Sequence, residues 1–153
     1  ETYKLNLQIL GTDISRKSIE YATIGKYNPI EIERGLPKEI LVKYFDQTSE
    51  KNFWLVRNEL RLFSSFKQLN LMEDFTYLGK FDIIFCRNVA IYFGAEDKKK
   101  VFCKISKMLK GNSPLLIGST ESIEGICPEI ESKRYLGVTY YQLKEPAVFS
   151  MRG

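Results

Sequence analysis

The order of apolar and polar positions along the chain predicts four strands. Residues 3–10 (YKLNLQIL) alternate and then become continuously apolar, and residues 139–144 (TYYQLK) alternate again. Residues 81–86 (FDIIFC) and 114–118 (PLLIG) are apolar almost throughout. A period of two is typical of half-buried strands, and a short continuous apolar run is typical of strands buried on both faces. We therefore expect a sheet in which the strands at 81–86 and 114–118 are buried.

Two helices are expected between these strands. Ser15 has the side chain of an N-cap for a helix that reaches about Ile24, where Gly25 would end it. A second helix is expected over residues 96–109, before Gly111. One face of this helix carries its apolar side chains, Val101, Phe102, Ile105, Met108 and Leu109. Strands that alternate with helices over short loops favour an open α/β sheet.

Residues 40–67 have a different pattern. They contain three short aromatic-rich pieces separated by polar turns, at residues 41–45, 53–57 and 62–66. We interpret these pieces as a small antiparallel insertion, although residues 58–63 are equally compatible with a helix. Upstream of them, Asn28-Pro29 and residues 35–37 (GLP) are typical of a loop.

The composition is that of a globular protein. A length of 153 residues fits one domain, with 44% hydrophobic and 27% charged residues. No apolar run approaches the roughly 20 residues of a bilayer span, so we expect a cytoplasmic protein without membrane insertion. The three cysteines, Cys86, Cys103 and Cys127, are too few and too scattered to predict disulfides or a zinc site. We therefore expect reduced thiols and no metal.

Charge and the lack of histidine narrow the chemistry. The formal net charge of +4 is small and favours an acidic partner. Nucleic acid is not expected as a partner, because the aromatic residues do not interleave with basic ones. The chain has no histidine, which excludes Ser-His-Asp triads, Cys-His pairs and His-ligated zinc. Any chemistry must use other polar side chains or a bound cofactor.

Polar residues follow the expected strands where ligands of open α/β sheets bind. Asp13 comes after the first strand and before a helix, so it either accepts hydrogen bonds from ribose hydroxyls or caps that helix. Arg87, Asn88 and Tyr92 follow the strand at 81–86, and three polar groups there favour a site. Residues 118–122 (GSTES) follow the next strand and equally fit a helix N-cap.

Several of these segments resemble one known family. Residues 81–93 (FDIIFCRNVAIYF) closely resemble the signature of the chemotaxis receptor methyltransferases, the CheR family. Residues 11–15 (GTDIS) are similar to the acid motif of that family's second strand. Further matches occur in the family's order, at YFDQT…WLVRNELR (44–61), QLNL (68–71) and GSTES (118–122).

The resemblance implies a class I S-adenosylmethionine (SAM) methyltransferase sheet of the Rossmann-like α/β type. The chain would be a partial SAM-dependent methyltransferase domain over residues 1–153, with an inserted antiparallel β-subdomain at about 40–67. Its first strand, the family's glycine-rich loop and the N-terminal helical domain are missing from this sequence. That first strand lies at the centre of the family's sheet, so its absence would leave unpaired strand edges.

The resemblance also implies a cofactor and roles for particular residues. The cofactor would be SAM, with S-adenosylhomocysteine as product. Asp13 would bind the ribose, Asn70 and Leu71 would flank the adenosine, and Arg87 and Asn88 would line the cofactor pocket.

The implied reaction is esterification of glutamate side chains. Its partner would be the cytoplasmic domain of methyl-accepting chemotaxis receptors. Tyr92 would lie near the sulfonium and orient the methyl group, and Arg87 would compensate the substrate carboxylate. Two alternatives are a non-catalytic receptor-binding fragment and a methyltransferase with another substrate.

Overall fold

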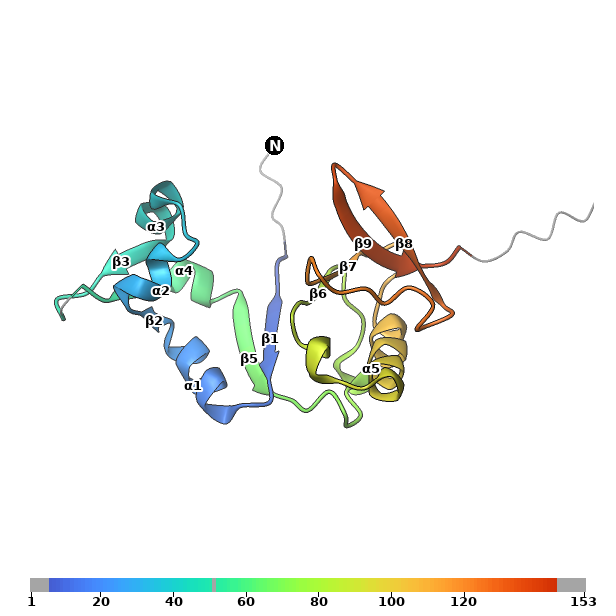
Figure 1. The fold of residues 1–153 in the computed structure, drawn as a ribbon. Coiled ribbons are helices and arrows are strands. Elements are labelled where there is room, and N and C mark those ends of the chain that lie inside the picture. Colours follow the sequence, from blue (N-terminus) through green and yellow to red (C-terminus); the bar gives the residue numbers. More distant parts are fainter. Residues whose placement is uncertain (1–5, 51, 146–153) are drawn as a thin grey trace, which may run out of the picture. The chain divides into compact units, whose positions relative to one another are not determined.

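The computed structural model describes residues 6–50 and 52–145 and shows a mixed α/β chain (Figure 1). The predicted α/β class is therefore confirmed. The chain divides into two compact units, Glu1–Asn70 and Leu71–Gly153, which we describe one at a time. None of the helices in the described residues has the length and apolar character of a membrane span.

A parallel strand pair and one helix form the base of the first unit. Strand β1 (Ile9–Asp13) pairs in parallel with β5 (Ser64–Gln68), so that Asp13 lies opposite Gln68. Helix α1 (Arg16–Ile24) follows β1. Its N-cap is Ser15, whose hydroxyl accepts the Ser18 N–H at 3.3 Å, and Gly25 ends it with a φ of 67°. The expected helix is confirmed, whereas the strand expected at residues 3–10 starts later, and its residues 3–5 lie outside the described residues.

A small antiparallel sheet occupies the other end of this unit (Figure 1). Its strand order is β2 (Lys26–Tyr27), β4 (Trp54–Val56) and β3 (Phe45–Gln47). The Tyr27 ring packs edge-on against Tyr21 and Phe45, at centroid distances of 5.6 and 6.3 Å.

Two of the three pieces expected in this insertion differ from the antiparallel strands predicted. Residues 41–45 mostly belong to helix α3 (Lys38–Tyr44), which has Glu39 in its first turn and Lys43 in its last turn, as the helix dipole favours. The strand expected at residues 62–66 exists in part, because residues 64–66 belong to β5. Its place in the antiparallel insertion is wrong, since β5 pairs in parallel with β1. The third expected strand is confirmed in part as β4, at Trp54–Val56.

Two short helices occupy segments with turn-like sequences. Helix α2 (Pro29–Glu33) replaces the loop expected at Asn28-Pro29, because Asn28 and Glu31 form a reciprocal capping box and proline suits the first helical position. Helix α4 (Asn58–Arg61) confirms the helical alternative for residues 58–63.

The second unit contains a four-stranded mixed sheet. Its order is β6 (Ile84–Cys86), β7 (Leu115–Ile117), β9 (Val138–Leu143) and β8 (Ile130–Tyr135). Strands β6 and β7 are parallel, and β9 is antiparallel to both of its neighbours. The two short 3-10 helices are η1 (Thr76–Leu78) and η2 (Ala90–Tyr92).

The strand expected to be buried over residues 81–86 is shorter and more exposed. Only Ile84–Cys86 is a strand, and Phe81 instead exchanges backbone hydrogen bonds with Met108 and Lys110. Phe85 is 68% exposed, because β6 is the outermost strand of its sheet in the described part of the chain. The strands expected at 114–118 and 139–144 are confirmed as β7 and β9.

Helix α5 (Ala95–Lys107) contributes Val101, Phe102 and Ile105 to the core of this unit. The five apolar side chains expected on one face, which include the two residues after the helix, are all buried: Val101, Phe102, Ile105, Met108 and Leu109. Leu115 and Ile123 are also in the core, at 0% and 2% exposure. Phe102 and Ile123 line the same small pocket.

Candidate functional site

Asp13 is the last residue of β1 and is exposed. Its Oδ1 accepts the Ser15 N–H at 2.7 Å, and its backbone carbonyl accepts the Leu69 N–H at 2.9 Å. The N-cap of α1 is Ser15, so Asp13 shapes the turn before the helix and is not its cap. An exposed carboxylate thus stands at the carboxyl end of a parallel strand pair, where such sheets bind ligands.

Asn70 and Leu71 follow β5 and are both half-buried. Leu71 begins the second unit, and there its carbonyl accepts a hydrogen bond from Lys104 Nζ at 2.6 Å. Lys104 also donates to the Glu73 carbonyl and lies 4.7 Å from the centre of the Phe75 ring. Burial lowers the pKa of the Lys104 amine, while nearby carboxylates oppose that shift. Helix α5 therefore holds the Leu71 segment through one lysine.

Sequence reasoning missed the contribution of Lys104. The only signal for Lys104 in the sequence is its position in a helix, between the apolar residues Cys103 and Ile105. That position is typical of a solvated residue as well, and the carbonyl partner lies 33 residues upstream.

Arg87, Asn88 and Tyr92 lie together in the segment after β6 and are all exposed. Asn88 has a φ of 58°, a left-handed conformation that asparagine tolerates better than most residues. Tyr92 ends η2 with 83% of its surface exposed, whereas Ala90 in the same turn is 3% exposed and anchors it. The structure thus presents the three predicted side chains to solvent in one short segment.

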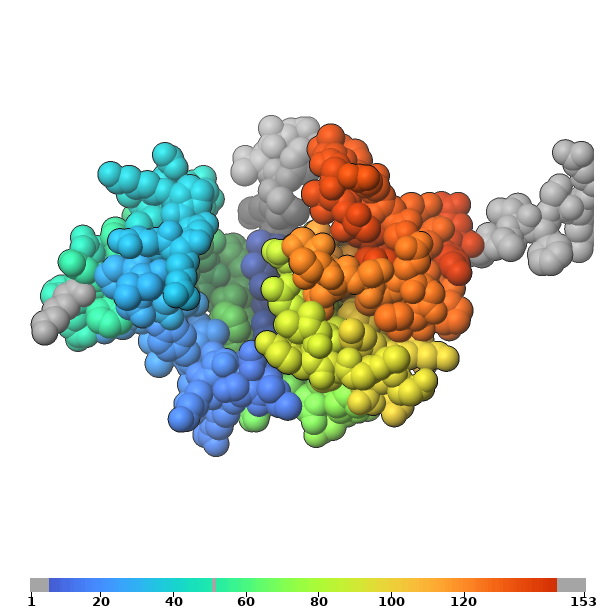
Figure 2. Space-filling view, in the orientation of Figure 1, coloured from blue at the N-terminus to red at the C-terminus, as the bar shows by residue number. Residues whose placement is uncertain are grey.

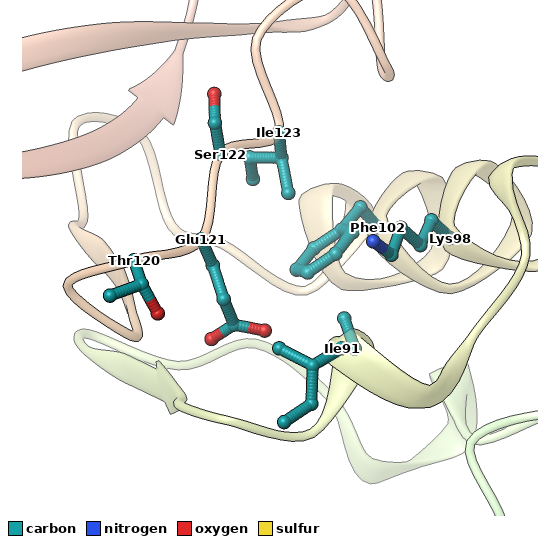
Figure 3. A pocket seen from close by; sticks show the side chains of 8 residues that line it. Ile91, Lys98, Phe102, Thr120, Glu121, Ser122 and Ile123 are labelled. Carbon is teal, nitrogen blue, oxygen red and sulfur yellow. The ribbon is translucent and has the colours of Figure 1, made fainter.

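Glu121 joins this segment to the loop after β7. One of its oxygens, Oε2, accepts the backbone N–H groups of Asn88 and Gly118, each at 2.7 Å. Figure 3 shows its carboxylate turned away from Ser122 and toward the segment that carries Ile91. No helix begins after Gly118 in the described residues, so the N-cap alternative for residues 118–122 is wrong. The acid of that motif bridges two loops instead.

Two further features make the Glu121 bridge tight. A methyl group at Gly118 would lie 2.2 Å from Asn88 Oδ1 and 2.5 Å from Glu121 Oε2, so a larger residue there would push these two side-chain ends apart. The other carboxylate oxygen, Glu121 Oε1, is buried and has no hydrogen-bond partner among the residues that the structure describes. A buried acceptor of this kind is a site for a ligand or a water.

A small pocket lies next to this carboxylate (Figure 3). Its volume is about 110 Å³, well below the several hundred Å³ of a typical ligand site. It is lined by Ala90, Ile91, Lys98, Phe102, Thr120, Glu121, Ser122 and Ile123. A pocket of this size fits a side chain or a few waters and not a nucleoside.

Cys86 immediately precedes the segment with the predicted site residues. It is 7% exposed, and burial, followed by the charge of Glu121, raises the pKa of its thiol to about 11. A thiol that stays protonated at neutral pH is a poor nucleophile. Cys86 is therefore a packing residue of β6.

Comparison with known proteins identifies the family. Residues 1–135 match the model of the SAM-binding domain of CheR methyltransferase. Chemotaxis protein methyltransferase Cher2 of Pseudomonas putida is 38% identical over 123 residues, which are 80% of this chain and 44% of that protein. Chemotaxis protein methyltransferases of Vibrio parahaemolyticus and Borreliella burgdorferi are 36% and 41% identical, over 91% and 78% of this chain.

The chain spans about half the length of these curated relatives, 50% for the Vibrio protein and 42% for the Borreliella protein. The matched residues 1–135 include every site residue predicted from the sequence. The family match implies a class I SAM-methyltransferase fold, in agreement with the mixed α/β structure. The resemblance drawn from the motifs is thereby confirmed: the chain belongs to the CheR methyltransferase family, whose SAM-binding domain model it matches over residues 1–135.

Proposed function

We propose that the protein containing this chain transfers the methyl group of SAM to glutamate side chains of chemotaxis receptors, forming methyl esters. The observation that carries the proposal is the family match over residues 1–135, together with relatives at 36–41% identity that are named chemotaxis protein methyltransferases. The polar segment after β6, with Arg87, Asn88 and Tyr92, agrees with it. We further propose a cytoplasmic location, because the substrate residues lie in the receptor's cytoplasmic domain.

The residues proposed to hold SAM have suitable chemistry in the structure. Asp13 offers an exposed carboxylate at the end of β1. A carboxylate in this position can accept hydrogen bonds from the ribose hydroxyl groups. Asn70 and Leu71, an amide and an apolar side chain that are both half-buried, would flank the adenosine. In the second unit, Arg87 and Asn88 follow the carboxyl end of β6. Taken one by one, these side chains have the chemistry that a nucleoside with a charged tail requires, and the cofactor would supply an activated methyl group when bound.

The catalytic roles follow from the charge of the substrate. A glutamate side chain is already an anion at neutral pH, so its oxygen needs no general base. Positioning of that oxygen then contributes most of the rate. We assign the binding of the substrate carboxylate to the guanidinium of Arg87 and the orientation of the transferred methyl group to Tyr92, both of which are exposed.

We also propose that residues 1–153 are one part of the methyltransferase domain and that the small antiparallel sheet is its inserted β-subdomain. The sheet β2-β4-β3 supports this proposal, since it shares no strand with the β1-β5 pair. Its observed strands span Lys26–Val56, an earlier segment than the residues 40–67 expected from the sequence.

Two measurements test the proposed function. Calorimetry on the 153-residue chain should show binding of S-adenosylhomocysteine, and Asp13→Ala should weaken it at least tenfold, because the ribose loses a charged hydrogen-bond partner. Incubation with radiolabelled SAM and a receptor cytoplasmic fragment should then label the receptor. The label should be released by mild alkali, which hydrolyses methyl esters but not methylated amines.

The outcomes separate the alternatives. Binding of S-adenosylhomocysteine without receptor labelling would favour a non-catalytic fragment. Alkali-stable label, or label on another acceptor, would favour a methyltransferase with a different substrate. A folded full-length protein that neither binds the product nor labels the receptor would contradict the proposal. Tyr92→Phe should lower turnover with little change in product binding, and an unchanged turnover would remove Tyr92 from the reaction.

A further inference from the structure

Two of the three cysteines meet a glutamate on the second unit. Cys103 lies on helix α5, and Cys127 and Glu129 lie on the loop before β8. Their two sulfurs and a carboxylate oxygen all lie within 4.8 Å of one another. The Cys127 thiol donates a hydrogen bond to Glu129 Oε2 at 2.8 Å, and a bound ion would replace that proton. Figure 2 shows the orange loop and yellow α5 side by side in this unit.

The three side chains are held by well-packed elements. Cys127 is 1% exposed, whereas Glu129, two residues further on after Pro128, is exposed to solvent. Ser106, which is 2% exposed, donates a hydrogen bond to the Cys103 carbonyl at 3.0 Å, and its hydroxyl lies 3.7 Å from Cys127 Sγ. Cys127 is therefore the buried member of the cluster, Cys103 is half-buried and Glu129 is exposed.

We propose that Cys103, Cys127 and Glu129 form a binding site for a zinc ion. Two thiolates and a carboxylate are ligands that zinc accepts, with water in a fourth position. Tetrahedral zinc with bonds of about 2.3 Å to sulfur needs two sulfurs roughly 3.8 Å apart. The two sulfurs here are no more than 4.8 Å apart, so the required spacing is compatible with the structure. Both thiols release their protons to solvent when the ion binds, and Glu129 is already ionised at neutral pH.

The surrounding charges suit such a site. Two thiolates and one carboxylate carry three negative charges, one more than the ion neutralises. The positive charges of Lys107 and Lys144 act on Glu129 and offset the excess. A bound ion would join helix α5 to the start of β8, two elements that are 23 residues apart in sequence, from Lys107 to Ile130. This inference does not depend on the methyltransferase reaction.

Cobalt titration tests the site directly. The 153-residue chain is reduced, freed of metal with a chelator and titrated with Co²⁺ under reducing conditions. One equivalent should bind and give thiolate-to-cobalt charge-transfer absorption, which Zn²⁺ should then abolish by displacement. Zn²⁺ should also raise the melting temperature of the wild type, because an ion that binds only the folded state stabilises it.

Variants identify the ligands. Cys103→Ser and Cys127→Ala should remove the charge-transfer band, and Glu129→Gln, an exposed change that spares the fold, should weaken Co²⁺ binding about tenfold or more. Cys86→Ser and Glu131→Gln are matched controls and should bind Co²⁺ with wild-type affinity. An unchanged affinity in Glu129→Gln and Cys103→Ser, or no charge-transfer band in the folded wild type, would overturn the proposal. A wild type that takes up no metal but forms a Cys103–Cys127 disulfide in air would also overturn it, in favour of a redox pair.

Discussion

Replacing Glu121 with alanine tests whether this residue holds the segment after β6 in place. Its Oε2 accepts two backbone N–H groups, from Asn88 and Gly118, each at 2.7 Å. Alanine removes both acceptor interactions at once. It also removes the buried Oε1, which lacks a partner among the described residues.

The expected cost follows from the surroundings of the two donors. Gly118 is buried, so its N–H stays unpaired in the variant, and a lost hydrogen bond to a charged group costs about 1.5–3 kcal/mol. Asn88 is exposed, so water replaces the carboxylate there at little cost. We expect a loss of roughly 2–3 kcal/mol in the stability of the second unit. This corresponds to roughly 30- to 150-fold in the opening equilibrium.

Amide hydrogen exchange measured by NMR is the appropriate assay, because it reports each N–H separately. The Gly118 amide should exchange roughly 30- to 150-fold faster in Glu121→Ala than in the wild type. Glu121→Gln, which keeps one uncharged acceptor, should lie between the two. Glu124→Ala is the matched control, since Glu124 is an exposed glutamate three residues further on. Unchanged exchange at Gly118 in Glu121→Ala would refute the reasoning.

Three further outcomes are expected. Gly118→Ala should lower stability by about 1–3 kcal/mol in urea unfolding, because the added methyl would lie 2.2 Å from Asn88 Oδ1. Cys86 should resist iodoacetamide at pH 7.5 in the folded chain and react in denaturant, since burial raises the pKa of its thiol to about 11; peptide mass spectrometry measures both. The hydrogen bond from the Tyr21 hydroxyl, at 2.7 Å, lowers the pKa of Glu31 below its unfolded value. That stabilisation is complete above about pH 4.3 and is lost as the pH falls through the folded pKa. Glu31→Gln should therefore lose less stability than the wild type between pH 6 and pH 3. Urea titrations followed by the fluorescence of the single tryptophan measure this difference.

The sequence alone determined those features whose signals are local. Ser15 and Gly25 bound helix α1 as predicted, because capping depends on residues within one turn. The buried face of α5 followed from the helical period, and all five side chains expected there are buried. The motif at residues 81–93 identified the family, since it is a contiguous stretch of distinctive residues.

The tertiary structure decided which distant segments meet. Strand β5 reads like any short strand, and only pairing with β1, Asp13 opposite Gln68, shows that it belongs to the parallel sheet. The bond from Asn88 to Glu121 spans 33 residues, and no periodic pattern encodes it. The same holds for Cys103 and Cys127, which look scattered in the sequence and lie within 4.8 Å in the fold. Local propensity sets elements and caps, whereas such contacts depend on how the elements pack against one another.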